Sequence, residues 1–129
     1  MVPATNGKFA NKAFIIKTFV PNKAVDLQGG VNGTNVQQYT DNKGEAQVFL
    51  ILPADQIYTP NNAPQVPAVF VPVSGTQYKI INFEQPTKCL SVDKNTKNLN
   101  YAAYTGEPNQ KFVIFQNGTK FAFVDQFTK

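Results

Sequence analysis

Short apolar runs recur along the whole chain, and most of them are bounded by Gly, Pro or Asn. The runs are rich in Val, Ile, Phe and Tyr, which is typical of β-strands, and no window of a dozen residues carries the period of an amphipathic helix. The pattern therefore predicts an all-β protein. The predicted strands cover residues 13–19, 24–28, 36–40, 46–52, 77–83, 89–93, 100–105, 111–115 and 120–127.

The predicted strands fall into two similar blocks, residues 12–52 and 76–116. Each block runs from an apolar strand to a short strand that begins with Lys, then to a Tyr-Thr pair, and ends at Gln-x-Phe. Shared order of this kind indicates a structural unit that is used more than once. Residues 53–75 repeat part of the pattern (QIYTPNN, then AVFVPV), and we interpret them as half of a third, shortened unit. The prolines in this stretch also suit a plain loop.

The length of the repeat narrows the architecture. Short strands that repeat about every forty residues fit a propeller or a small barrel with pseudo-threefold symmetry. A propeller needs at least about four blades, too many for 129 residues. The barrel is therefore preferred, and a chain of this length forms one domain with a core of its own.

The composition provides enough apolar residues for a core and argues against nucleic acid and membranes as partners. Hydrophobic residues make up 42% of the chain, with 11 Phe and 5 Tyr. The net charge of +4 comes from lysines spread along the sequence, without Arg, so a nucleic-acid interface is not expected. No apolar run reaches about 18 residues, so no membrane span is expected.

The first residues and the two Asn-Gly-Thr sequons bear on localisation. The opening MVPATNGKFANK lacks the apolar segment of a signal peptide, so a cytoplasmic location or leaderless secretion is expected. The sequons at Asn32 and Asn117 would accept glycans in a secreted protein. Because Asn-Gly is a strong hairpin signal, we interpret them as turn residues.

The residues needed for catalysis are scarce. The chain has no His, and its one cysteine, Cys89, lies in an apolar strand where an inert thiol is expected. Zinc clusters and His-based catalytic triads therefore have no ligands or base. The 8 carboxylates are scattered, and no phosphate-binding loop is present. The sequence predicts a protein that is not an enzyme and holds no metal or cofactor.

The order Val-Asp-Leu, Gln-x-Tyr and Gln-x-Phe resembles the units of the ricin B-type β-trefoil lectins, which end in Gln-x-Trp. Here Phe49 and Phe112 stand in place of the Trp. The resemblance covers both blocks and, more faintly, the middle stretch. It implies an all-β, β-trefoil fold with a shortened middle repeat, and residues 1–129 as a single domain. It also implies a non-catalytic carbohydrate-binding protein, a small lectin with a defence or toxin role.

The resemblance also suggests ligands and assembly. Galactose-type sugars are the first expected glycans. Lectin sites bind single sugars weakly and compensate by multivalency, so a homodimer or an assembly with another protein is expected.

Site residues follow from the resemblance unit by unit. In these lectins each unit supplies an Asp on its second strand, an aromatic platform on its third, and an Asn just before the final Gln. The first block has Asp26 and Tyr39 at the first two places, flanked by Gln37 and Gln47. The Asn place is taken by Ala46, and Asn42 on the turn is a candidate substitute. The alternative to sugar binding for Asp26 is a structural role, in which its carboxylate caps the turn that follows the strand.

The other units are less complete. The second block has Tyr104 as platform and Asn109 at the Asn place, but Ser91 replaces the Asp, with Asp93 two residues further on. The middle stretch offers Tyr58 and the pair Asn61 and Asn62 without a matching acid.

The Gln-x-Phe endings predict core packing. The aromatic residue should fill the barrel, which assigns Phe49, Phe112 and Phe70 to the core. The Gln should be partly buried and should bond backbone groups that otherwise lack partners.

Two further functions stay open. One is a loop-presenting protease inhibitor, with the proline-rich residues 59–67 as the loop, because rigidity lowers the entropy cost of presentation. The other is a protein-interaction component of a larger, toxin-like complex in which the sugar sites are degenerate.

Overall fold

The structure is a computed structural model and describes residues 1–59 and 65–129. Its regular elements are short strands joined by turns, three of which are single 3-10 turns. The elements are β1 (Val2–Pro3), η1 (Gly7–Phe9), β2 (Phe14–Ile15), β3 (Lys23–Leu27), β4 (Val36–Thr40), η2 (Glu45–Gln47), β5 (Phe49–Pro53), β6 (Gln77–Asn82), β7 (Lys88–Val92), β8 (Leu99–Ala103), η4 (Pro108–Gln110), β9 (Phe112–Asn117) and β10 (Lys120–Asp125).

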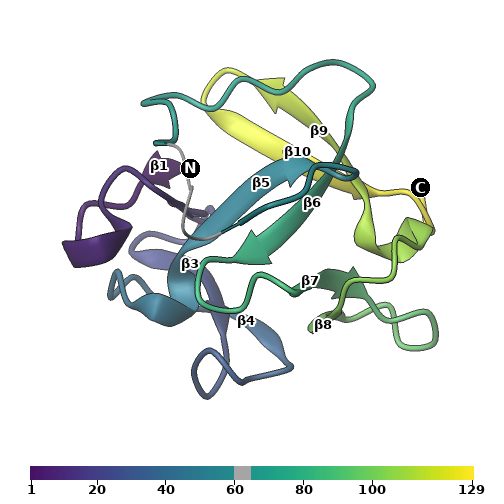
Figure 1. The fold of residues 1–129 in the computed structure, drawn as a ribbon, viewed down its shortest axis with the longest axis horizontal. Coiled ribbons are helices and arrows are strands. Elements are labelled where there is room, and N and C mark those ends of the chain that lie inside the picture. The colour runs from purple at the N-terminus through teal and green to yellow at the C-terminus, as the bar shows by residue number, and fades with distance from the viewer. Residues whose placement is uncertain (60–64) are drawn as a thin grey trace.

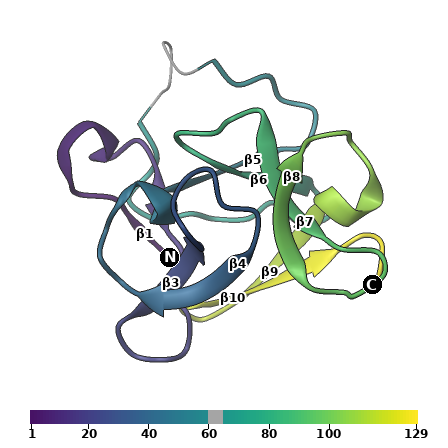
Figure 2. The same ribbon diagram turned by 90° about the horizontal axis from the view of Figure 1, so that it is seen from below.

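Six strands form one antiparallel sheet in the order β1-β2-β5-β6-β9-β10. The other four form two separate hairpins, β3–β4 and β7–β8. Figure 1 shows both hairpins at one end of the sheet, and Figure 2 shows them from below. A bridge between Asn35 and Asn100 joins the two hairpins to each other.

The chain repeats one order of elements. β2, β3, β4 and β5 run from the sheet through a hairpin and back to the sheet, and β6, β7, β8 and β9 do the same. The two predicted blocks are therefore two structural units, as the sequence repeat indicated. The all-β prediction is also confirmed.

Several boundaries differ from the prediction. The strand expected over residues 13–19 is reduced to the two residues of β2, and the one expected over 46–52 begins as the turn η2. The two-residue strand β1 carries too little pattern for a sequence reading to detect.

The middle stretch differs most. Beyond Pro53, its described residues form no strand, so AVFVPV (68–73) is not the strand that the third unit would require. The middle repeat is shortened to a connection between β5 and β6, and the loop alternative was right. The reason is local, because Pro67 and Pro72 cannot donate backbone hydrogen bonds to a sheet. Asn61, Asn62 and most of the predicted loop 59–67 lie outside the described residues.

The core fills the space enclosed by the sheet and the hairpins. Phe49 and Phe112 are 0% and 4% exposed, and Phe70 is 9% exposed, so all three predictions of core packing are confirmed. Phe70 comes from the β5–β6 connection and packs edge-on against Phe14 and Tyr78, with ring centroids 6.0 Å and 5.6 Å apart. Aromatic pairs prefer this geometry. Among the described residues, no helix is long and apolar enough to span a membrane.

Candidate functional site

The hairpin β3–β4 places three of the predicted site residues on one face. Asp26 pairs with Gln37, and Ala24 pairs with Tyr39. Because side chains alternate between the two faces of a strand, Asp26, Gln37 and Tyr39 point to the same side. The structure therefore brings together the carboxylate and the aromatic ring expected of the first block.

The Asp26 carboxylate is buried and is held by two side-chain amides. Gln37 Nε2 donates to Oδ1 at 3.0 Å, and Gln47 Nε2 donates to Oδ2 at 2.9 Å. The side chain does not cap the following turn, which was its alternative role, since both donors are glutamines. A carboxylate offers about four lone-pair positions, so acceptor capacity remains for a ligand.

Gln47 is fully buried and has no free polar atom for a ligand. Its Oε1 accepts the backbone N–H groups of Asn42 and Lys43, and its Nε2 donates to Asp26 and to the Thr40 carbonyl. The predicted bonding of backbone groups is confirmed. The prediction that Gln47 contacts sugar is corrected, because it positions Asp26 from below the surface.

Asp26, Gln37 and Tyr39 line a hollow of about 440 Å³ on the surface of the hairpin. Tyr39 is 49% exposed there, so much of its ring surface is available for stacking. Gly29 and Gly30 turn the chain at one edge with φ values of +85° and +103°, in the region where a side chain is strained. Sequence reasoning did not select these two glycines, although a Gly-Gly pair directly after the Asp-bearing strand is a visible signal. The hollow is lined by Asp26, Gly29, Gly30, Gln37, Tyr39 and Asn42, among others.

The hairpin β7–β8 repeats the scaffold. Gln110 Oε1 accepts the N–H groups of Thr105 and Gly106, and its Nε2 donates to the Ala103 carbonyl and to Ser91 Oγ at 3.1 Å. Each contact of Gln47 has a counterpart here, and the Thr105 hydroxyl makes one further hydrogen bond to Gln110 Oε1 at 3.2 Å. Ser91 stands where Asp26 stands, so this hairpin has no carboxylate at the equivalent place.

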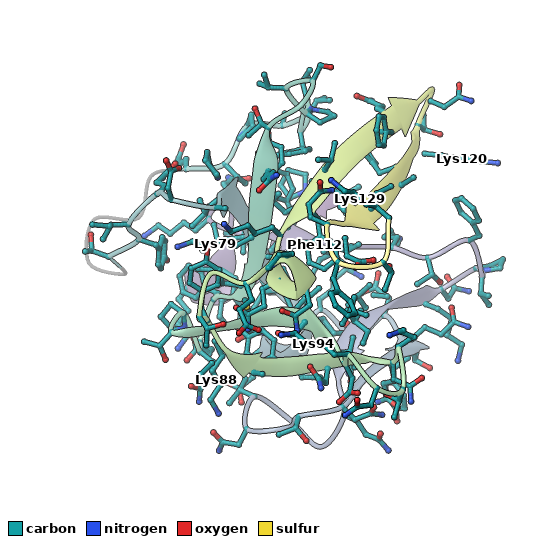
Figure 3. All side chains as sticks on the ribbon, turned by 90° about the vertical axis from the view of Figure 1, so that its right-hand side faces the viewer. Lys79, Lys88, Lys94, Phe112, Lys120 and Lys129 are labelled. Atoms are coloured by element: carbon teal, nitrogen blue, oxygen red, sulfur yellow. The ribbon has the colours of Figure 1, made fainter. Side chains whose placement is uncertain are left out.

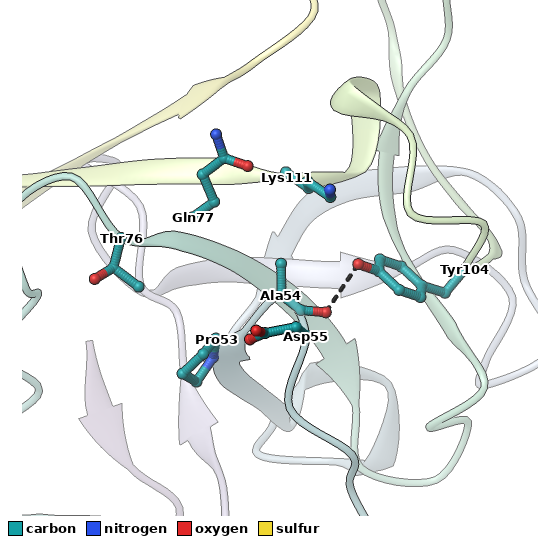
Figure 4. A pocket seen from close by; sticks show the side chains of 7 residues that line it. All are labelled: Pro53, Ala54, Asp55, Thr76, Gln77, Tyr104 and Lys111. Atoms are coloured by element: carbon teal, nitrogen blue, oxygen red, sulfur yellow. Dashed lines mark hydrogen bonds between the residues drawn. The ribbon is translucent and has the colours of Figure 1, made fainter.

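The predicted equivalence of Tyr104 and Tyr39 is wrong. The Thr40 and Ala103 carbonyls each accept a hydrogen bond from the buried glutamine of their own unit, so these two residues are equivalent. The residue before each is then equivalent too, which makes Ala102 the counterpart of Tyr39. Tyr104 follows the end of β8. The two blocks differ by two residues between the Tyr-Thr pair and the final Gln, which the sequence comparison passed over. Tyr104 Oη instead donates to the Ala54 carbonyl at 2.9 Å (Figure 4).

Asn109 and Asp93 each make hydrogen bonds within the protein. Asn109 Nδ2 donates to the Val92 carbonyl at 3.0 Å, while its buried Oδ1 has no partner among the described residues. Asp93 accepts the N–H groups of Thr96 and Asn95, and these hydrogen bonds lower the pKa of its carboxyl. Tyr104 lines a hollow to which Asn109 does not belong, and the two side chains bond different segments, Ala54 and Val92.

The lysines labelled in Figure 3 do not gather on one element, and the acidic side chains of the described residues form no metal-binding group. These lysines lie over different elements, including β6, β7 and β10. In the part of the chain that the structure describes, no group of three His, Cys, Asp or Glu side chains could hold a metal ion.

Comparison with known proteins supports the assignment of the fold. No protein-family model and no curated protein match the chain. Among solved structures, a designed 3-fold symmetric protein, ThreeFoil, matches with a TM-score of 0.58 at 19% identity. The match covers 81% of this chain, which spans 65% of the length of that protein. At this identity the likeness shows the fold alone, and it confirms the predicted β-trefoil.

Proposed function

We propose that this protein is a non-catalytic carbohydrate-binding protein with one sugar site, on the hairpin β3–β4. The observation that carries the proposal is the shared hollow of the buried Asp26 carboxylate and the half-exposed Tyr39 ring. Sugar sites combine a few oriented polar groups with an apolar surface, and this hollow offers both.

Each group has a separate task in the proposed site. The Asp26 oxygens accept hydrogen bonds from hydroxyl groups of the sugar, and Gln37, which already donates to Asp26, offers its amide oxygen as a further acceptor. The Tyr39 ring stacks on the apolar C–H face of the sugar ring. Asn42 lines the same hollow and supplies the side-chain amide that is missing at position 46, where an alanine stands in place of asparagine. Galactose-type sugars are the first ligands to test.

One shallow site gives weak binding. Linking several such sites raises the overall affinity without any new contact, so we also propose that the protein acts as a homodimer or as part of a larger assembly.

The test is calorimetric titration of galactose-type sugars after a glycan-array screen. Tyr39→Ala should weaken binding by about tenfold, since it removes the ring on which the sugar stacks, and stacking of a nucleobase on an aromatic ring, the nearest measured case, is worth about 1 to 3 kcal/mol. Tyr39→Phe keeps the ring and should bind like the wild type. Asp26→Asn should also weaken binding, because the replacement amide turns a donor towards the amide nitrogen of either Gln37 or Gln47, both of which are donors here.

The matched control is Phe19→Ala, which removes a 77% exposed aromatic ring outside the hollow and should leave binding unchanged. Absence of sugar binding by the wild type, or equal binding by wild type and Tyr39→Ala, would contradict the proposal.

A second candidate function is protein interaction through the β5–β6 connection. Val69, Val71 and Val73 are each more than 60% exposed, while Phe70 between them is anchored in the core. An anchored segment with apolar side chains directed outward suits presentation to a partner, such as a protease cleft. Protease inhibition that is lost in Val71→Asp, without any glycan binding, would favour this function over the first.

A further inference from the structure

A second hollow, of about 330 Å³, lies where four segments of the chain meet. The segments are the end of β5, the start of β6, the residue after β8 and the residue before β9. Figure 4 shows Gln77 and Lys111 above the hydrogen bond between Tyr104 and Ala54, and Asp55 below it. Nothing in the sequence pattern brought these segments together. The hollow is lined by Pro53, Asp55, Thr76, Gln77, Tyr104 and Lys111, with Ala54 between them.

The floor of this hollow is fixed by hydrogen bonds. Ala54 N–H donates to the Gln77 carbonyl at 2.8 Å, and Tyr104 Oη donates to the Ala54 carbonyl at 2.9 Å. Burial raises the pKa of Tyr104, with smaller contributions from Cys89 and Asp55, so the phenol stays protonated and keeps donating. Lys79 Nζ lies 4.8 Å from the centre of the Tyr104 ring. The hollow therefore keeps its shape without a ligand.

The two charged side chains that line the hollow form no ion pair among the described residues. The three ion pairs among the described residues join Lys8 to Glu84, Lys17 to Asp41, and Lys94 to Glu107. Asp55 and Lys111 take part in none of them, although they line the same space. The Thr76 hydroxyl and the Gln77 side-chain amide add two neutral polar groups beside them. A carboxylate, an ammonium and two neutral hydrogen-bonding side chains thus line one ligand-sized hollow.

We propose that this hollow binds an acidic sugar, with the sugar carboxylate against Lys111 and its hydroxyl groups against Asp55, Thr76 and Gln77. A neutral sugar leaves Lys111 without a counter-charge. A bare inorganic anion offers no donor to Asp55 and is repelled by it. Electrostatic complementarity distinguishes between the remaining candidates. Lys79 is not among the lining residues, but its Nζ lies 4.8 Å from the centre of the lining Tyr104 ring, so together with Lys111 and Asp55 the surroundings carry one net positive charge. A ligand with one net negative charge balances that charge, whereas a zwitterionic amino acid does not.

The inference concerns a hollow separate from the one at Asp26 and does not depend on sugar binding there. The experiment is calorimetric titration of the whole chain with D-glucuronic acid, and with glucose, alanine and inorganic sulfate as comparison ligands. Glucuronic acid should bind, and glucose should bind more weakly by about tenfold, the ratio that one charge-assisted hydrogen bond supplies.

Substitutions assign the binding to this hollow. Lys111→Gln should weaken glucuronic acid by about tenfold and leave glucose unchanged, and Asp55→Asn should weaken both ligands. Lys12→Gln is the matched control, because it removes an exposed lysine elsewhere. Tyr39→Ala should bind glucuronic acid like the wild type, which separates this hollow from the site on β3–β4.

Four results would overturn the proposal. They are absence of glucuronic acid binding by the wild type, equal binding by wild type and Lys111→Gln, tighter binding of alanine or sulfate than of glucuronic acid, and loss of glucuronic acid binding in Tyr39→Ala. Circular dichroism of each variant shows that it is folded. Because Asp55 is exposed and Lys111 is half-buried, both variants are expected to keep the fold.

Discussion

A buried glutamine fastens each hairpin of this protein to the turn that follows it. Gln47 and Gln110 each accept two backbone N–H groups with the amide oxygen and donate to a strand carbonyl with the amide nitrogen. The remaining hydrogen of each amide goes to the side chain on the second strand, which is Asp26 in one hairpin and Ser91 in the other. One structural residue thus supports either a charged or a neutral partner.

The first prediction concerns this glutamine. Gln47→Ala leaves the Thr40 carbonyl, two N–H groups and one Asp26 oxygen without their partner, and unsatisfied buried groups cost about 1 to 3 kcal/mol. We expect the free energy of unfolding to fall by about 3 kcal/mol in urea denaturation. Gln116→Ala, at an exposed glutamine, is the control and should change little. Equal stability of the two variants would contradict the structural role of Gln47.

The second prediction concerns Cys89, which is buried and lies 3.8 Å from Ser91 Oγ. Burial raises the pKa of the thiol from 9.0 to about 11. The neutral thiol is therefore favoured in the folded protein, and its contribution to stability is complete below pH 9 and lost as the pH rises to about 11. We expect iodoacetamide to modify Cys89 slowly at pH 8 in the native protein and rapidly in urea. Rapid modification of the native protein would show that the thiol is accessible.

At the scale of elements, the two hairpins share a backbone plan but are attached to the sheet differently. Tyr101 on β8 is 1% exposed, and its hydroxyl accepts the Asn82 N–H and donates to the carbonyls of Gln85 or Lys88. The pairing with β7 puts Tyr101 opposite Leu90, just as Gln38 on β4 lies opposite Val25. Gln38 is exposed. A tyrosine therefore ties β7–β8 to β6, and β3–β4 has no such tie from the matching position.

The third prediction tests this asymmetry. Tyr101→Phe removes the hydroxyl and leaves the Asn82 N–H unsatisfied, so we expect a loss of about 1 to 3 kcal/mol in the free energy of unfolding. Gln38→Ala changes the equivalent position of the other hairpin and should cost less than about 0.5 kcal/mol, as exposed substitutions do. Hydrogen exchange of the β7–β8 amides should also accelerate in Tyr101→Phe. Equal effects of the two substitutions would remove the asymmetry.

The elements also show what the sequence could and could not predict. The short runs rich in Val, Ile, Phe and Tyr, bounded by Gly, Pro or Asn, placed β3, β4, β6 and β10 within one or two residues, because such side chains favour strands and such boundary residues favour turns. The Gln-x-Phe endings predicted the buried Gln and Phe of both blocks. The register of β8 was missed, since a Tyr-Thr pair looks the same in a strand as just beyond it. The hollow at Asp55 and Lys111 was missed because its segments are distant in sequence and share no motif.

At the scale of the whole molecule, residues 65–76 of the β5–β6 connection run along the end of the sheet opposite the hairpins, and one of their side chains reaches the core (Figure 1). This side chain is Phe70. Its ring contacts Phe14 from β2, Tyr78 from β6 and Phe121 from β10, with centroids 6.0 Å, 5.6 Å and 6.2 Å away. Three strands of the sheet thus meet one side chain of a segment whose described residues form no strand.

The last prediction follows from that position. Phe70→Ala opens a cavity between three strands, and such substitutions of a buried phenylalanine cost about 3 to 5 kcal/mol. Since Phe70 is 9% exposed and lies at one end of the core, we expect a loss near the lower value in urea denaturation. Val69→Ala, at a 63% exposed neighbour, is the control and should leave stability nearly unchanged. A loss no larger than that of the control would mean that the six strands hold their arrangement without this ring, and that the connection is attached to the barrel elsewhere.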